Sequence, residues 1–168
     1  VMLLLRRKEG EKGSKLAGVP DRRVLSTTIQ AIIVPAVFLT ILFGFYIGLH
    51  GQLTPGGGFQ AGVILATAPL LVYLAQNTEA FTRITSHPLM EMIEAVGAGA
   101  YALIGVAGVI SGVPLLTNIL PLGQTGDVFS AGSIALISGC VGVEVTAAFL
   151  LVAFTYLEEI ISGQIADG

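Results

Sequence analysis

Charge is what this sequence lacks most. Only 11% of its 168 residues are Asp, Glu, Lys or Arg, whereas 54% are hydrophobic and the mean hydropathy is +0.86. In a water-soluble domain about a quarter of the residues are charged. Because the charges are too few to cover a surface that faces water, we expect most of the chain to lie in lipid or against other apolar subunits.

Cysteine and histidine are also scarce, which excludes several kinds of site. The single cysteine, Cys140, cannot form an internal disulfide, and no CxxC pair is present. The two histidines, His50 and His87, lie far apart in the sequence. Since we find no metal-ligand cluster, Ser/His/Asp set or cofactor motif, we expect no catalytic residue, metal site or cofactor in this chain, and no nucleic-acid partner.

Long apolar runs, in contrast, are abundant. A helix needs about 20 residues to cross the hydrocarbon core of a bilayer, and within lipid the backbone must satisfy its own hydrogen bonds. The runs lack the alternating polarity of membrane strands. We therefore predict an all-α integral membrane protein with four transmembrane helices, at Val24–Leu49, Gly56–Ala75, Leu89–Gly112 and Ala131–Leu157.

The eight lysines and arginines occupy two regions. Seven lie within residues 1–23, the eighth is Arg83, and the loops at 50–58 and 113–130 contain none. The positive-inside rule then places both termini and the 76–88 loop in the cytoplasm. We predict a multi-pass protein of the cell membrane, divided into a basic cytoplasmic tail at 1–23, a transmembrane domain at 24–157 and a C-terminal tail at 158–168.

A glycine-rich stretch, HGQLTPGGGFQAG at residues 50–62, joins the first two predicted helices, and we call it the signature loop. Pro55 cannot donate a backbone hydrogen bond, and the glycines that follow accept dihedral angles closed to other residues. The stretch lacks the Lys-Ser/Thr pair of a phosphate-binding P-loop. We interpret it as a tight turn packed against neighbouring subunits, although such a turn can also let an ion approach the backbone.

This loop resembles the signature of the MnhB family, a membrane subunit of Mrp-type cation/proton antiporters, which runs His-Gly-x-x-Ser/Thr-Pro-Gly-Gly-Gly-Phe-Gln-x-Gly. A late helix that carries an acid and ends in Glu158 and Glu159 matches as well. Gln52 departs from the pattern, because a second histidine often stands there, so the resemblance implies no proton-relay histidine at that position. The matching residues are His50, Gly51, Thr54, Pro55, Gly56, Gly57, Gly58, Phe59, Gln60 and Gly62.

The resemblance implies one subunit of a large membrane complex that helps to form a path for Na⁺ and H⁺. Its partners would be the other membrane subunits of an antiporter, or of the antiporter module of a membrane-bound hydrogenase or sulfane sulfur reductase. The alternative is a stand-alone four-helix, proton-coupled exporter of small molecules. Small exporters of that kind carry their acid in the first helix, whereas here the first predicted helix has no acid.

Glu144 is the most informative single residue, because it lies near the middle of the fourth predicted helix. A charged carboxylate at that depth costs several kcal/mol unless it is paired, hydrated or protonated. No Lys or Arg of this chain lies at the same depth. Two interpretations stay open: an acid on an ion path, or a protonated acid that holds helices together.

Glu91, Glu94 and His50 complete the candidate ion path. The two glutamates are three residues apart and share one helix face, although acids early in a helix also complement its dipole. Pro88 fits the start of that helix, with Ser86 or His87 as its cap. His50 suits proton handling by its side-chain chemistry, or it is an interface histidine bonded to the glycine loop.

Small residues suggest where helices approach closely. Gly108 and Gly112 form a GxxxG motif, and Gly99 and Gly139 belong to further small-residue ladders. Because lipid supplies no hydrophobic drive between helices, small residues that let backbones approach are favoured at their contacts. The ladders predict close packing with neighbouring helices, without identifying those helices.

Overall fold

The computed structural model describes residues 27–53, 55–75, 78–124, 126–127 and 130–166. These residues form helices and connecting turns, without strands, which confirms the all-α prediction. The predicted tail at 1–23 and Thr54 of the signature loop lie outside the described residues. The helices are α1 (Thr27–Leu49), α2 (Gly58–Leu74), α3 (Thr78–Ile84), α4 (His87–Ile110) and α5 (Ser133–Ala166).

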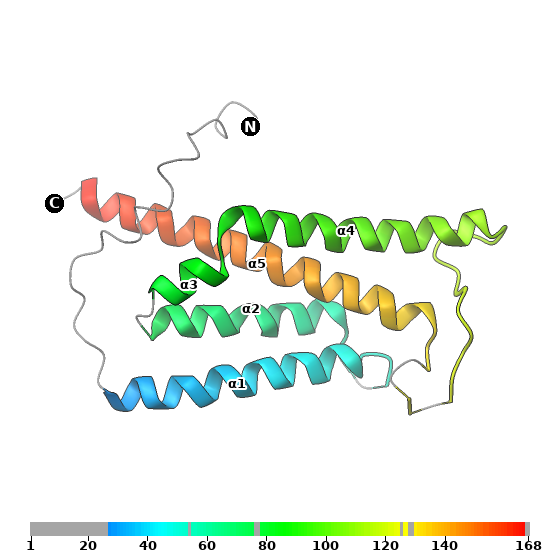
Figure 1. Cartoon of the computed structure of the whole chain (residues 1–168), viewed down its shortest axis with the longest axis horizontal. Coiled ribbons are helices and arrows are strands. Elements are labelled where there is room, and N and C mark those ends of the chain that lie inside the picture. The colour runs from blue at the N-terminus through cyan, green and yellow to red at the C-terminus, as the bar shows by residue number, and fades with distance from the viewer. Residues whose placement is uncertain (1–26, 54, 76–77, 125, 128–129, 167–168) are drawn as a thin grey trace.

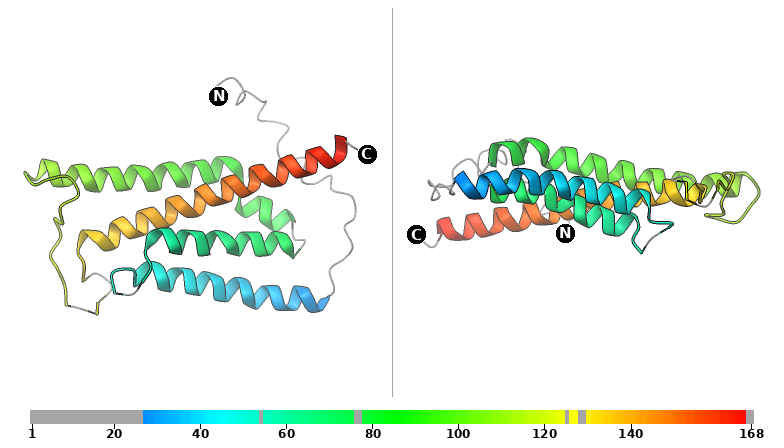
Figure 2. Two further views of the ribbon diagram at one scale, coloured as in Figure 1. Left: turned by 180° about the vertical axis from the view of Figure 1, so that it is seen from behind. Right: turned by 90° about the horizontal axis from the view of Figure 1, so that it is seen from below.

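The four long helices lie side by side in a single layer, in the order α1, α2, α5, α4 (Figure 1). α2 packs against α1 and α5, and α5 packs against α4 on its other side. Seen from below in Figure 2, the layer is thin. Because no second layer of described residues covers it, large apolar side chains remain exposed on the long helices, such as Phe38, Leu103 and Val152. This surface suits a protein embedded in lipid or among other membrane subunits.

Three stretches of the described chain are long and apolar enough to cross a membrane: Ala31–Leu49, Ala80–Ile110 and Ser133–Glu159. α2 is shorter, at 17 residues, or about 25 Å at 1.5 Å per residue. It runs back along α1, so that α4 begins at the end of the layer where α1 began (Figure 1). α2 therefore crosses as well, and a bilayer tolerates a helix of this length by thinning slightly.

Because successive long helices run in opposite directions, the segments that connect them lie at the two ends of the layer. The described residues of the signature loop and of the 111–132 connection lie at one end of the layer. Helix α3 and the end of α5 lie at the other end (Figures 1 and 2). This grouping agrees with the four-crossing topology expected from the sequence. Which end faces the cytoplasm stays a prediction of the positive-inside rule.

Two features differ from the sequence-based prediction. The 76–88 loop contains the short helix α3, which docks through the fully buried Phe81 against Tyr73 and Phe154, at ring-centroid distances of 5.1 and 6.3 Å. Seven residues are too few to show a helical period, so the pattern missed this helix. α5 also continues as a helix to Ala166, through most of the stretch predicted as a C-terminal tail.

The start of α4 follows the prediction closely. Ser86 is its N-cap and Pro88 lies in its first turn, although the Ser86 side chain makes no capping hydrogen bond. Proline is favoured there because its missing N–H would have no helical partner in any case. The helix begins two residues before the predicted boundary, at His87.

The small residues named from the sequence do not join helices within the described chain. A Cβ added to Gly99, Gly112 or Gly139 would meet no atom within 4 Å, and one on Gly108 would approach Pro114 of the following connection. The close contacts between helices use other glycines, which are described below.

The connection between α4 and α5 is fixed to the start of α5. The Asn118 side-chain oxygen accepts hydrogen bonds from the backbone N–H of Ser133 at 2.8 Å and of Leu120 at 3.3 Å. The N–H of Ile119 donates to the Ser133 hydroxyl at 3.1 Å. These bonds satisfy backbone groups that a helix start and a loop would otherwise leave unpaired.

Candidate functional site

The signature loop is a tight turn whose shape requires glycine. Gly56 and Gly57 have φ angles of 154° and 146°, which side-chain-bearing residues rarely adopt. A Cβ on Gly51 would lie 2.7 Å from the Gly57 Cα, so the two ends of the turn touch. The loop thus reverses the chain between α1 and α2 in very little space.

The last glycine of the run brings α2 onto α5. A Cβ on Gly58 would overlap the carbonyl oxygen of Ser138, and one on Gly62 would lie 2.8 Å from the carbonyl oxygen of Gly142. The single hydrogen of the Thr146 hydroxyl is shared between the Gly142 carbonyl, at 2.7 Å, and the Gly62 carbonyl, at 3.2 Å. Such close backbone approach is how small residues hold helices together in lipid.

Two further signature residues contact the chain itself. The ring of Phe59 meets that of Phe149 in α5 edge-on, with centroids 6.3 Å apart. His50 stacks on Tyr46 at 4.6 Å, and its Nδ1 lies 3.1 Å from the Tyr46 carbonyl oxygen. These contacts of the signature loop are to α5 and α1 of this chain, and the packing against neighbouring subunits that we expect from the sequence stays a prediction. The sequence could not identify α5 as the partner, because it lies some 80 residues further along.

Glu144 lies where α5 crosses α4. A Cβ built on Gly97 of α4 would lie 2.9 Å from both the Cβ and the backbone nitrogen of Glu144, so the two helices are in direct contact there. Within the described part of the chain, Glu144 makes no hydrogen bond or ion pair. No buried side-chain oxygen or nitrogen in this part lacks a partner. The Glu144 carboxyl therefore reaches the surface of the layer, beside the contact between α4 and α5.

Glu94 is the acid of α4 nearest to that contact in the sequence. It is half-buried and precedes Gly97 by three residues, which places it about one turn away on the same side of the helix. Like Glu144, it has no hydrogen bond or ion pair to another described residue. We call Glu94, Gly97 and Glu144 the acidic seam.

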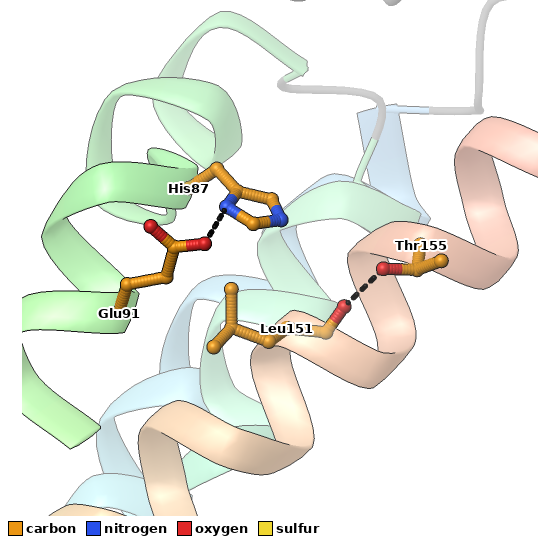
Figure 3. Close-up of polar contacts among 4 residues, drawn as sticks. All are labelled: His87, Glu91, Leu151 and Thr155. Carbon is orange, nitrogen blue, oxygen red and sulfur yellow. Dashed lines mark hydrogen bonds and ion pairs between the residues drawn. The ribbon is translucent and has the colours of Figure 1, made fainter. Parts of the chain in front are cut away.

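Glu91 has a different environment, although it lies only three residues from Glu94. Its carboxylate is 3.0 Å from Nδ1 of His87, and the Glu91 side chain is 61% exposed (Figure 3). The His87 ring in turn meets Phe154 of α5 edge-on, at 6.2 Å. The pair lies at the start of α4, at the end of the layer opposite the signature loop.

The predicted ion-path residues thus do not form one cluster. Glu91 lies at one end of the layer and His50 at the other, with Glu94 and Glu144 between them along the helices. No group of three or more His, Cys, Asp or Glu residues that could hold a metal ion occurs among the described residues. Sequence reasoning missed Gly97, although a glycine inside a helix costs about 1 kcal/mol relative to alanine and so indicates a packing role.

Comparison with known proteins shows the family to which the chain belongs. A family model described as "Domain related to MnhB subunit of Na+/H+ antiporter" matches residues 28–151, which include all of the signature loop and Glu144. An uncharacterized protein of Methanocaldococcus jannaschii is 34% identical over 134 residues, covering 73% of this chain and 51% of that protein.

A Staphylococcus aureus protein (strain Newman) named "Putative antiporter subunit mnhB2" is 35% identical over 95 residues, covering 52% of this chain and 66% of that protein. The chain thus spans about half the length of the first relative and less than two thirds of the second. The family match covers most of the chain, including α2, α3, α4 and the Glu144 region of α5. The chain is a multi-pass membrane protein that belongs to the MnhB family.

Proposed function

We propose that this chain is one component of a multisubunit Mrp-type cation/proton antiporter, in which its acidic seam contributes to the path of Na⁺ and H⁺. Family membership and the name of the Staphylococcus aureus relative support the antiporter assignment. The helices form a single layer in which many large apolar side chains are exposed, and this supports a role as one subunit among several. Its partners would be other membrane subunits, with lipid covering the remaining surface.

The ion-path part of this proposal depends on Glu144, because of its depth in the membrane. Glu144 follows the start of α5 by eleven residues, or about 16 Å at 1.5 Å per residue, which places it deep within the hydrocarbon thickness. Arg83 is the only Lys or Arg among the described residues, and it is exposed in α3, away from α5's centre. An acidic residue within the membrane that has no Lys or Arg partner usually belongs to a functional site.

The other interpretation, a protonated acid that holds two helices of this chain together, has less support. Such a role would need the Glu144 carboxyl to hydrogen-bond a group on another helix. Among the described residues it has no such bond, and the contact at Gly97 is made by its Cβ and backbone nitrogen. A carboxyl that reaches the surface instead suits exchange of a proton or Na⁺ with water or with a group on a neighbouring subunit.

The test is Glu144→Gln in the complete complex, because glutamine keeps the shape and removes the titrating group. We expect a loss of Na⁺-dependent proton transport of about 100-fold, the contribution of a positioned proton-transfer group. Transport is measured in membrane vesicles, and copurification of the other subunits controls for assembly. Wild-type transport by an assembled Glu144→Gln complex would contradict the ion-path proposal.

A separate measurement tests the parent complex. Native mass spectrometry of the gently solubilised complex should show this chain together with several different membrane subunits. Additional subunits with nickel–iron or iron–sulfur centres would identify the antiporter module of a hydrogenase or sulfur reductase. A small homo-oligomer of this chain alone would favour the stand-alone exporter and overturn the subunit assignment.

A further inference from the structure

We infer that Gly97 is a positioning residue, which sets where the Glu144 side chain lies between α4 and α5. The transport part of this inference rests on the proposed function of Glu144, whereas the part that concerns the chemical environment of the carboxyl group does not. The inference starts from the distances at this crossing.

The atoms closest to Gly97 belong mainly to the residue that it would position. An added Cβ would lie 2.9 Å from the Glu144 Cβ, 2.9 Å from its backbone nitrogen and 3.1 Å from the Cys140 carbonyl oxygen. Two of these three atoms are backbone atoms of α5, and the third is bonded directly to its backbone. None of them can rotate aside as the end of a flexible side chain can, so a methyl group here would push the two helices apart.

The other glycines of α4 do not have this contact. A Cβ on Gly99 would meet nothing within 4 Å, and Cβ atoms on Gly105 and Gly108 would approach only residues of the connection that follows α4. Gly97 is therefore the glycine of α4 at which the backbone of α5 is nearest. Its low helix propensity, about 1 kcal/mol worse than alanine, is offset by this close approach.

Contacts further along the same pair of helices make the effect local. Met90 of α4 is buried with Ala147 and Leu150 of α5, and the His87 ring meets Phe154 edge-on. These contacts join α4 and α5 on the side of the crossing toward the start of α4. Since that region stays packed, a methyl group at Gly97 should open the seam mainly at Glu144 and change the room and the solvation of its carboxyl.

The experiment compares Gly97→Ala with Gly99→Ala in the complete complex in membranes. The two glycines are two residues apart on one helix and gain the same helix propensity, but only Gly97 contacts α5. The first readout is the rate at which a membrane-permeant carbodiimide modifies Glu144, followed by mass spectrometry as the modified fraction of its peptide. The second readout is the dependence of Na⁺-driven proton transport on pH.

We expect Gly97→Ala to change the modification rate by about threefold or more, because displacements of about 1 Å alter reactivity strongly. It should also shift the pH dependence of transport, because the added methyl group alters the room around the Glu144 carboxyl. Gly99→Ala should leave both readouts unchanged. A role limited to stability would lower the yield of complex without changing either readout per assembled molecule.

Two outcomes would overturn the inference. One is an assembled Gly97→Ala complex with the modification rate and pH dependence of the wild type. The other is complete loss of the complex in Gly97→Ala, which would make Gly97 a requirement of folding. If Glu144→Gln leaves transport intact but Gly97→Ala still changes the modification rate, the proposed function fails and the positioning inference stands.

Discussion

α5 contacts α2 on one side and α4 on the other, and different kinds of residue make the two contacts. Toward α2 it presents Gly142 and Thr146, where backbone meets backbone and one hydroxyl bridges the two helices. Toward α4 it presents Glu144, whose Cβ and backbone nitrogen lie against Gly97 while its carboxyl makes no bond to another described residue. Both sides depend on a glycine of the neighbouring helix, but only the second carries acids.

The signature loop, which is the most recognisable part of the sequence, therefore lies on a different side of α5 from the acidic seam, which we assign to ion movement. The glycines of the signature loop make a turn and join α2 to α5, so their contacts within the chain are structural. The acidic seam lies on the opposite side of α5 and is built from residues with no conspicuous motif. If this separation holds, changes on the α2 side should affect assembly, and changes on the α4 side should affect transport in an assembled complex.

The largest effect should come from Gly58→Val. Its side chain would collide with the Ser138 carbonyl oxygen, and overpacking of this kind costs about 3 kcal/mol or more where backbone must move. We expect little or no assembled complex, measured by copurification with the other subunits. Gly139→Val is the matched control, because a Cβ there meets nothing within 4 Å, and it should assemble. Normal assembly of Gly58→Val would show that the α2–α5 contact is looser than described.

Glu94→Gln should have the next largest effect, on transport rather than on assembly. Because Glu94 lies one turn from the Glu144 contact, we expect Na⁺-dependent proton transport to fall by about tenfold, less than for Glu144→Gln. The measurement is transport by vesicles that contain equal amounts of assembled complex. A loss of assembly in place of transport would place Glu94 among the structural residues and weaken the comparison.

Thr146→Val tests the α2 side more gently. Valine keeps the branched shape and removes the hydroxyl that donates to the Gly62 carbonyl at 3.2 Å. We expect a loss of about 0.6 kcal/mol, the average for hydrogen bonds between membrane helices, measured as a small decrease in the thermal stability of the solubilised complex. Thr155→Val is the control, because Thr155 bonds only the Leu151 carbonyl of its own helix, at 2.9 Å (Figure 3). Equal effects of the two changes would remove the interhelical bond as a contributor.

Glu91→Gln should have the smallest effect. Its carboxylate is mostly exposed and paired with His87, and exposed pairs contribute about 0–1 kcal/mol. We expect transport within about twofold of the wild type, in contrast to Glu94→Gln on the same helix. A loss as large as that of Glu94→Gln would extend the acidic seam to the start of α4.

The residues of the acidic seam show how far sequence reasoning reached. Glu144 and Glu94 could be named in advance because a carboxylate inside an apolar run is costly, and that cost depends on composition alone. The pairing of Glu91 with His87 could not be predicted, because it depends on where the neighbouring side chains are placed. The contact of Gly97 with Glu144 could not be predicted either, since it joins positions 47 residues apart on different helices.

The sequence by itself determined that the long apolar runs lie in lipid, that there are four of them, and which of them contain acidic residues. Lipid cannot satisfy backbone hydrogen bonds, so long apolar runs must be helical wherever they lie. Only the tertiary structure decided that α5 lies between α2 and α4, that Gly58 and Gly62 are packed against α5, and that Glu144 lies next to Gly97. The physical reason is that close packing between helices depends on which backbones meet, and one-dimensional periodicity carries no information about that choice.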